Sequence, residues 1–90
     1  MATMIVRHRV ANFEHWKSVF DSLNETRKNE FNWLGTQVLR DEADPNLVTT
    51  INRVKDMASG KRYGGAQLLK DAMARAGVIG TPEVTLLRQL

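Results

Sequence analysis

Hydrophobic and polar residues alternate along the first ten positions of the chain, and this period of two predicts a β-strand over residues 3–10. One side of this strand carries Met4, Val6, His8 and Val10. The other side carries Ile5, Arg7 and Arg9. The first side is the more apolar one, so we assign it to the face that the helices cover. His8 is therefore predicted to point into the interior.

After this strand the spacing of large side chains changes to that of a helix over residues 13–31. The recurring positions are Phe13, Trp16, Phe20, Leu23 and Arg27. Asn12 precedes them as a helix cap, and Glu14 lies where a negative charge stabilises the positive end of the helix dipole. We predict one helix whose apolar face covers the sheet.

The middle of the chain predicts a hairpin. Residues 36–41 follow Gly35 and have the composition of a second strand, and residues 47–54 have that of a third. Between them, Asp44-Pro45-Asn46 has the composition of a turn.

The last third of the chain predicts a second helical region and a final strand. Asp56 is placed as a helix cap, and three glycines are predicted to interrupt this helix: Gly60, Gly64 and Gly65. The helix resumes over residues 66–76 and ends at Gly77 in the left-handed conformation. Pro82 then marks the start of a strand over residues 83–90, which is rich in Val, Thr and Leu.

The order β-α-β-β-α-β is that of the ferredoxin-like α+β plait, with a four-stranded antiparallel sheet and two helices on one face. Residues 1–90 are predicted to form one domain of this kind. The uncovered face of the sheet needs a partner, and a chain of 90 residues often completes its core with a second copy. We therefore predict a homodimer.

Composition excludes several functional classes. The chain has no cysteine, so disulfides, thiolate catalysis and cysteine-based zinc sites are excluded. Its two histidines lack a converging acidic pair, so no metal site is predicted. A net charge of +3 without a long basic run makes nucleic-acid binding an unfavoured interpretation. The apolar stretch at the N-terminus is too short for a signal peptide or a membrane span, so a cytoplasmic location without membrane contact is expected.

Three segments of the chain resemble a known family. They are Val6-Arg7-His8-Arg9-Val10 followed by Phe13 and Trp16, the Asp44-Pro45-Asn46 turn, and Ala72-Met73-Ala74-Arg75-Ala76-Gly77-Val78 with Pro82. Together they resemble the dimeric α+β barrel proteins, which include antibiotic biosynthesis monooxygenase-like domains and small bacterial cyclase-like proteins. The resemblance spans nearly the whole chain.

This resemblance implies a homodimer whose two sheets face each other, with a small-molecule cavity between the sheet and the helices. Some members of the family oxidise aromatic polyketides without metal or flavin, and others isomerise or cleave small rings. The chain departs from the family pattern over residues 60–65, where glycines replace an alanine-rich helix. These glycines predict either a loose helix or the hinge of a lid over the cavity.

His8 is the candidate catalytic residue, because an imidazole in such a cavity exchanges protons near neutral pH. The alternative is a core histidine that is hydrogen-bonded to the backbone. Trp16 is a core residue that could also line the cavity. In the predicted topology His8, Trp16 and residues 78–83 are expected to meet at one end of it. Asn52 on the third strand is a candidate to orient a carbonyl or phenol of a ligand, with a structural hydrogen bond as its alternative.

One further aromatic residue and two basic residues are candidates for the dimer interface. Trp33 precedes the second strand and is a candidate dimer contact. Arg7 and Arg9 face the uncovered side of the sheet, where buried guanidinium groups need partners. The candidate partners are Asp41, Glu42 and Glu83.

Two functions remain open from the sequence. The first is a small cofactor-independent enzyme, of the monooxygenase or of the cyclase and isomerase type, acting on a small apolar or aromatic compound. The second is a non-catalytic dimeric domain that binds a ligand or serves as an accessory module. A roomy cavity that exposes His8 would favour catalysis, and a filled interior around His8 would favour the second function.

Overall fold

The structure, a computed structural model, describes residues 1–90 as a four-stranded antiparallel sheet with helices on one face. The strands are β1 (Ala2–Val10), β2 (Trp33–Arg40), β3 (Leu47–Val54) and β4 (Val78–Arg88). The helices are α1 (Phe13–Ser22), α2 (Asn24–Glu30), α3 (Met57–Gly64) and α4 (Gln67–Arg75). The strand order is β2-β3-β1-β4, which confirms the predicted ferredoxin-like α+β fold.

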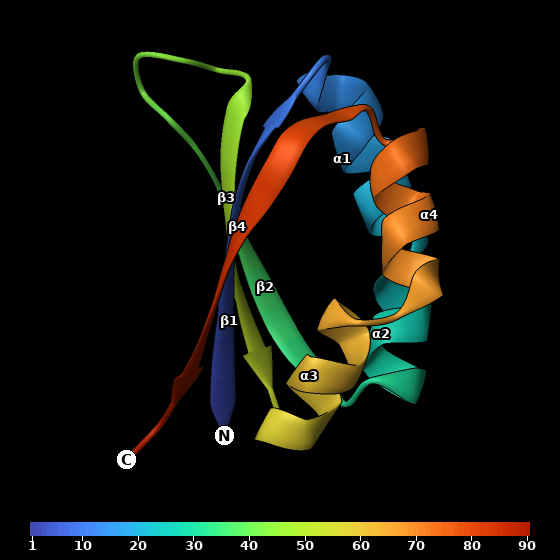
Figure 1. Ribbon diagram of the computed structural model, residues 1–90, viewed down its shortest axis with the longest axis vertical. Coiled ribbons are helices and arrows are strands. Elements are labelled where there is room, and N and C mark those ends of the chain that lie inside the picture. The colour runs from blue at the N-terminus through green and yellow to red at the C-terminus, as the bar shows by residue number, and fades with distance from the viewer.

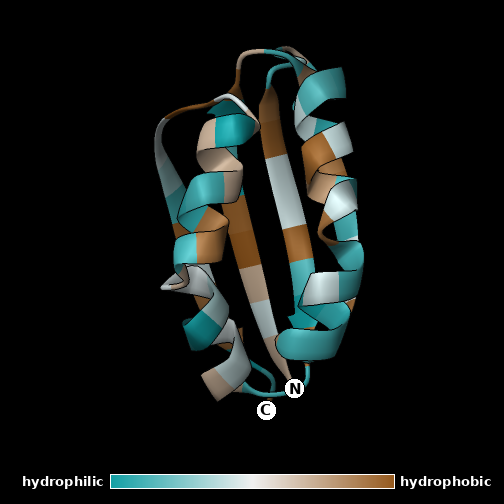
Figure 2. Cartoon of the chain, turned by 90° about the vertical axis from the view of Figure 1, so that its right-hand side faces the viewer, coloured by the Kyte–Doolittle hydropathy of each residue, from teal (hydrophilic) through white to brown (hydrophobic).

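The molecule has two layers, with every helix on the same side of the sheet (Figure 1). Seen from the helix side, α1 and α2 form one column and α3 and α4 form the other (Figure 2). The central strands lie behind and between these columns (Figure 2). None of the helices is long and apolar enough to cross a membrane. The opposite face of the sheet has no cover within the chain.

The predicted alternation along β1 is confirmed. The even-numbered residues from Ala2 to Val10 are buried beneath the helices, whereas Arg7 and Arg9 are exposed on the other face. β3 alternates in the same way, because its antiparallel register places Thr50 opposite Val6 and Asn52 opposite Met4. The helix-facing side chains of the two central strands therefore form the floor of the interior.

The last strand begins earlier than the sequence predicted. β4 runs from Val78, and its pairing with β1 shifts between Arg7 and Arg9. Gly80 in this stretch has φ of +75°, a conformation that favours glycine. Pro82 lies within the strand and does not start it. An edge strand with irregular pairing tolerates such a residue, which has no N–H to donate. The irregular stretch of β4 therefore lies next to His8 of β1.

The first helix is divided in two, which corrects the single helix predicted over residues 13–31. The division lies at Leu23, and the hydroxyl of Ser22 just before it donates to the carbonyl of Val19 at 2.6 Å. Such a bond competes with helical pairing of the backbone. The carbonyl of Phe20 consequently accepts from the N–H of Leu23 and from Nη2 of Arg27, which turns the Arg27 side chain inward.

Of the three glycines predicted to interrupt the second helical region, Gly65 does so and Gly60 does not. α3 continues through Gly60 and ends at Gly64, and the predicted break comes at Gly65 and Ala66. A Cβ at Gly60 would lie 3.1 Å from Cδ2 of Leu86, so the glycine allows α3 to lie close against β4. Gly60 therefore serves close packing of a regular helix, which is neither of the two predicted roles.

The helix caps follow the sequence prediction. Asn12 accepts from the N–H of His15 at 2.9 Å, and Asp56 accepts from the N–H of Ser59 at 2.7 Å. Gly77 follows α4 with φ of +76°. The two side-chain bonds set the starts of α1 and α3, and the left-handed conformation of Gly77 ends α4.

Two apolar clusters lie between the sheet and the helices. One contains Met4, Val6, Trp33, Val54 and Tyr63, and the other contains Val10, Trp16, Val48 and Ala76. Trp33 is 7% exposed and packs against Tyr63, with ring centroids 4.6 Å apart. It is a core residue, so its assignment to a dimer contact is wrong.

Candidate functional site

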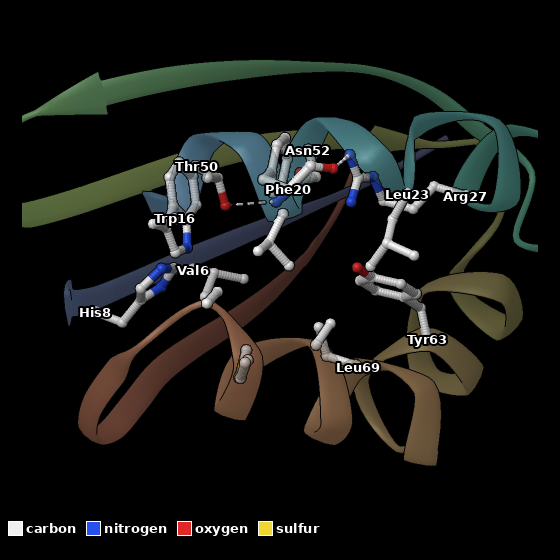
Figure 3. A pocket seen from close by; sticks show the side chains of 14 residues that line it. Val6, His8, Trp16, Phe20, Leu23, Arg27, Thr50, Asn52, Tyr63 and Leu69 are labelled. Carbon is white, nitrogen blue, oxygen red and sulfur yellow. Dashed lines mark hydrogen bonds between the residues drawn. The ribbon is translucent and has the colours of Figure 1, made fainter. Parts of the chain in front are cut away.

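A small cavity of about 50 Å³ lies between the sheet and the two helix columns. Figure 3 shows its walls, to which both central strands and all four helices contribute. Ten of the fourteen lining residues are hydrophobic, and none is acidic. The aromatic and polar lining residues include His8, Trp16, Phe20, Arg27, Asn52 and Tyr63. The site is thus an apolar chamber with a few polar groups.

His8 lies at one end of this cavity (Figure 3). Its side chain comes from β1 and is 6% exposed, and its ring lies 5.4 Å from that of Trp16. Neither ring nitrogen has a hydrogen-bond partner in the protein. The alternative of a histidine bonded to the backbone is therefore wrong, and the imidazole has both nitrogens free toward the cavity.

Burial lowers the pKa of the His8 imidazole below its ordinary value of 6.5. The charged form loses hydration in the apolar interior and gains no carboxylate in exchange, since no acidic residue lines the cavity. At neutral pH the imidazole is thus neutral and able to accept a proton.

This pKa shift predicts how stability depends on pH. In the unfolded chain the imidazole takes up a proton near pH 6.5, whereas in the folded protein it takes one up only at lower pH. Unfolding therefore binds protons in this range, so the free energy of unfolding should fall as the pH drops from about 7 through 6.5 toward the folded pKa. Urea unfolding at about pH 8, 6.5 and 5.5 measures the slope.

A pair of variants tests the origin of that slope. His8→Gln should remove this contribution, and His15→Gln should leave it in place because His15 is exposed on α1. Equal slopes for wild type and His8→Gln below about pH 7 would contradict the assignment.

Trp16 forms an aromatic wall of the cavity next to His8. It is 3% exposed, and its ring stacks on Phe20 with centroids 5.0 Å apart. Phe13, Phe20 and Leu23 on the same stripe are only half-buried, so the predicted apolar face of this helix covers the sheet mainly through Trp16. Trp16 thus occupies both predicted positions, because it belongs to the core and also lines the cavity.

Asn52 also lines the cavity, but the protein already uses its hydrogen-bonding capacity. Its Nδ2 donates to the carbonyl of Met4 at 3.0 Å and to Oγ1 of Thr50 at 2.9 Å. Its Oδ1 accepts from Oγ1 of Thr36 at 2.8 Å and from Nε1 of Trp33 at 3.3 Å. Asn52 would have to give up one of these bonds to bind a ligand, so its role toward a ligand stays a prediction.

Arg27 and Tyr63 line the other end of the cavity and were missed as site residues by the sequence analysis (Figure 3). Arg27 is 2% exposed and Tyr63 is 5% exposed. One signal for Arg27 was present in the sequence, because this cation continues the apolar stripe of the helix at the spacing of Phe20 and Leu23. Tyr63 lies in the glycine-rich segment, where no pattern marked a buried face.

The remaining predicted neighbours lie elsewhere. Residues 78–83 do not line the cavity, although we expected them to meet His8 and Trp16 there. Arg9 forms an ion pair with Asp44 of its own chain, which was not among the predicted partners. Nε2 of His15 donates to the carbonyl of Arg75 at 2.7 Å, and His15 is a surface residue.

In sequence, no family model and no curated protein matches the chain. In structure, an antibiotic biosynthesis monooxygenase superposes with a TM-score of 0.74 at 16% identity, covering 100% of this chain and 99% of that chain. SnoaB, a cofactor-independent oxygenase from Streptomyces nogalater, gives 0.78 at 17% identity over 99% and 92% of the two chains. The chain has the antibiotic biosynthesis monooxygenase fold. A conserved protein from Methanosarcina mazei Go1 shares it, with a TM-score of 0.76 at 17% identity over 100% and 94% of the chains.

At these identities the comparison concerns the path of the backbone. The antibiotic biosynthesis monooxygenase fold accounts for the two layers and the interior between them, whereas the groups that line the cavity belong to this chain. Any chemistry of this chain therefore depends on His8 and its neighbours, because one fold serves many functions.

Proposed function

We propose that the chain is a small cofactor-independent enzyme, of monooxygenase or isomerase type, that removes a proton from a small apolar or aromatic compound. His8 is the proton acceptor, Trp16 is the wall against which the compound lies, and Asn52 is a polar neighbour of the same cavity. The observation that carries the proposal is the buried imidazole whose two nitrogens have no partner in the protein.

A neutral buried imidazole suits this chemistry. Its lowered pKa leaves the accepting nitrogen unprotonated at neutral pH, and the apolar walls exclude water that would compete for it. Loss of a proton from an acidic C–H or O–H leaves an electron-rich anion. Such an anion either reacts with dioxygen or takes a proton back at another atom, so the oxygenase and isomerase alternatives share their first step. SnoaB, described as a cofactor-independent oxygenase, supports the first alternative by its fold.

The size of the cavity favours a small ligand. Apolar cavities of about 150 Å³ hold benzene, whereas this one measures about 50 Å³. A ring-sized compound would therefore need the half-buried side chains of the helix columns to move, among them Leu23, Leu69 and Met73. This small volume also supports the second function, a domain that binds a ligand without turning it over.

Deuterium exchange tests the shared first step. The protein is incubated in D₂O without oxygen together with a panel of small aryl ketones and hydroquinones, and NMR follows exchange at carbon above the uncatalysed rate. We expect catalysed exchange for at least one compound. Admission of oxygen then distinguishes oxygenation from isomerisation by the product. Ligand binding without exchange or product for the whole panel would favour the non-catalytic domain.

We also propose that the chain forms a homodimer through the uncovered face of its sheet. That face combines apolar side chains with charges of both signs. Ile5 lies opposite Ile51 on β3, and Arg7 lies opposite Glu83 on β4. Leu39 and Leu87 add exposed apolar surface, 40% and 46% exposed. A face of this kind is self-complementary, as a twofold contact between identical chains requires.

Light scattering at micromolar concentration should give about twice the chain mass of 10.2 kDa. Ile51→Arg, which places a charge at the centre of this face, should give a monomer because an unpaired buried charge is costly. Lys28→Glu on the exposed side of α2 is the matched control and should stay dimeric. A wild-type monomer at all accessible concentrations would disprove the dimer.

A further inference from the structure

Arg27 is a buried cation without a counter-ion. Its side chain is 2% exposed, and the ion pairs of the protein are Arg9 with Asp44 and Lys17 with Asp21. A guanidinium remains charged inside proteins, and a buried charge without a partner is strongly unfavourable. The fold therefore retains a group at this position that only a further partner would satisfy.

The bonds that Arg27 does make hold its guanidinium in one orientation. Nη2 donates to the carbonyl of Phe20 at 2.8 Å and to the side-chain oxygen of Asn24. The guanidinium carbon also lies 3.8 Å from the centroid of the Phe20 ring. These contacts explain a structural role for Nη2 at the junction of α1 and α2. They leave Nη1 buried without any partner.

The surroundings of Nη1 favour a negatively charged ligand. Arg27 lines the cavity, and no acidic residue there competes for it or repels an anion. The hydroxyl of Tyr63 points into the same space and can donate a second hydrogen bond (Figure 3). Apolar walls strengthen a charge-assisted hydrogen bond by excluding water.

We propose that the cavity binds its ligand as an oxyanion, with a carboxylate or phenolate oxygen on Nη1 of Arg27 and the apolar body of the ligand against Phe20 and Trp16. The other end of the ligand then lies toward His8, since His8 and Arg27 occupy opposite ends of the cavity (Figure 3). The ligand class is thus a small organic acid or an acidic phenol.

This inference rests on the proposed function only in placing the ligand in the same cavity, because anion binding requires no turnover. Preference for an anion without any catalysed exchange would support the inference and remove the catalytic proposal. Catalysed exchange that depends on His8, with no preference for anions, would do the reverse.

Two pairs of probes test the proposal with the wild-type protein. Acetate is compared with acetamide, and benzoate with benzamide, so that each anion has a neutral amide of nearly the same shape. Binding is followed by titration of the backbone and arginine Nε–H signals in NMR spectra. We expect the anion of at least one pair to bind about 10- to 100-fold more tightly than its amide, with the Arg27 signal among those that shift.

Variants assign the preference to Arg27. Arg27→Met should fold, because a flexible apolar side chain of similar length replaces an unpaired charge, and its anion preference should disappear. Arg62→Met is the matched control, since Arg62 is exposed, lies over the ring of Phe31 and does not line the cavity. That variant should retain the wild-type preference.

Two results would overturn the proposal. One is equal binding of anion and amide by the wild type in both pairs, which needs no variant. The other is an anion preference that survives in a folded Arg27→Met protein. If Arg27→Met does not fold, the wild-type titration decides by the Arg27 Nε–H signal, because an anion that binds without shifting that signal refutes the site.

Discussion

His8→Gln should fold and dimerise like the wild type while its catalysed proton exchange falls by about 10²–10⁴-fold, the usual contribution of a general acid or base. The imidazole nitrogens make no hydrogen bond in the protein, so glutamine breaks none when it replaces them. It is of similar size and is uncharged. The loss should therefore appear in the rate of exchange or oxygenation and leave the melting temperature within a few degrees.

His15→Gln is the control for the loss of an imidazole as such. His15 lies on the exposed side of α1 and contacts the end of α4, so its replacement should leave the rate unchanged. A His8→Gln protein that is destabilised but fully active would remove His8 from the mechanism. It would also return His8 to the role of a core residue.

Trp16→Ala should lower the free energy of unfolding by about 3–5 kcal/mol, the cost of removing a large buried aromatic side chain. Trp16 is 3% exposed and contacts the rings of His8, Phe13 and Phe20. Its removal would join a new void to the existing cavity. Urea unfolding measures this cost, which is a large part of the stability of a small domain.

Phe20→Ala is the matched variant for this prediction. Phe20 belongs to the same stripe but is half-buried, so its removal should cost less, about 1–2 kcal/mol. Trp16→Phe keeps an aromatic ring at the site and provides a folded form if Trp16→Ala is too unstable to study. A cost below about 1 kcal/mol for Trp16→Ala would mean that Trp16 does not hold α1 to the sheet.

Local patterns in the sequence predicted most of the fold. The alternation in residues 3–10 placed His8 on the helix side, and β3 has the predicted bounds Leu47–Val54. Caps at Asn12 and Asp56 and the left-handed Gly77 were also predicted correctly. Each of these features depends on residues that are close in sequence, so their chemistry can be read from the order of residues alone.

The errors have two physical causes. The division of the first helix at Leu23 follows from local hydrogen bonds of Ser22 and Arg27, which the helical spacing does not show. The regular course of α3 through Gly60 and the early start of β4 depend on contacts between distant segments. Gly60, for example, is favoured because Leu86 lies 3.1 Å from the place of a Cβ. Helix propensity alone counts this glycine as a breaker, and packing against β4 outweighs that preference.

The sequence by itself determined the element order, the helix-facing side of β1 and therefore the inward direction of His8 and the core position of Trp16. Only the tertiary structure decided which polar groups have partners. Asn52 is fully bonded by residues of β1, β2 and β3, whereas His8 and Nη1 of Arg27 are buried with none. Whether a buried group is satisfied depends on atoms brought together from several elements, and the order of residues does not specify those distances.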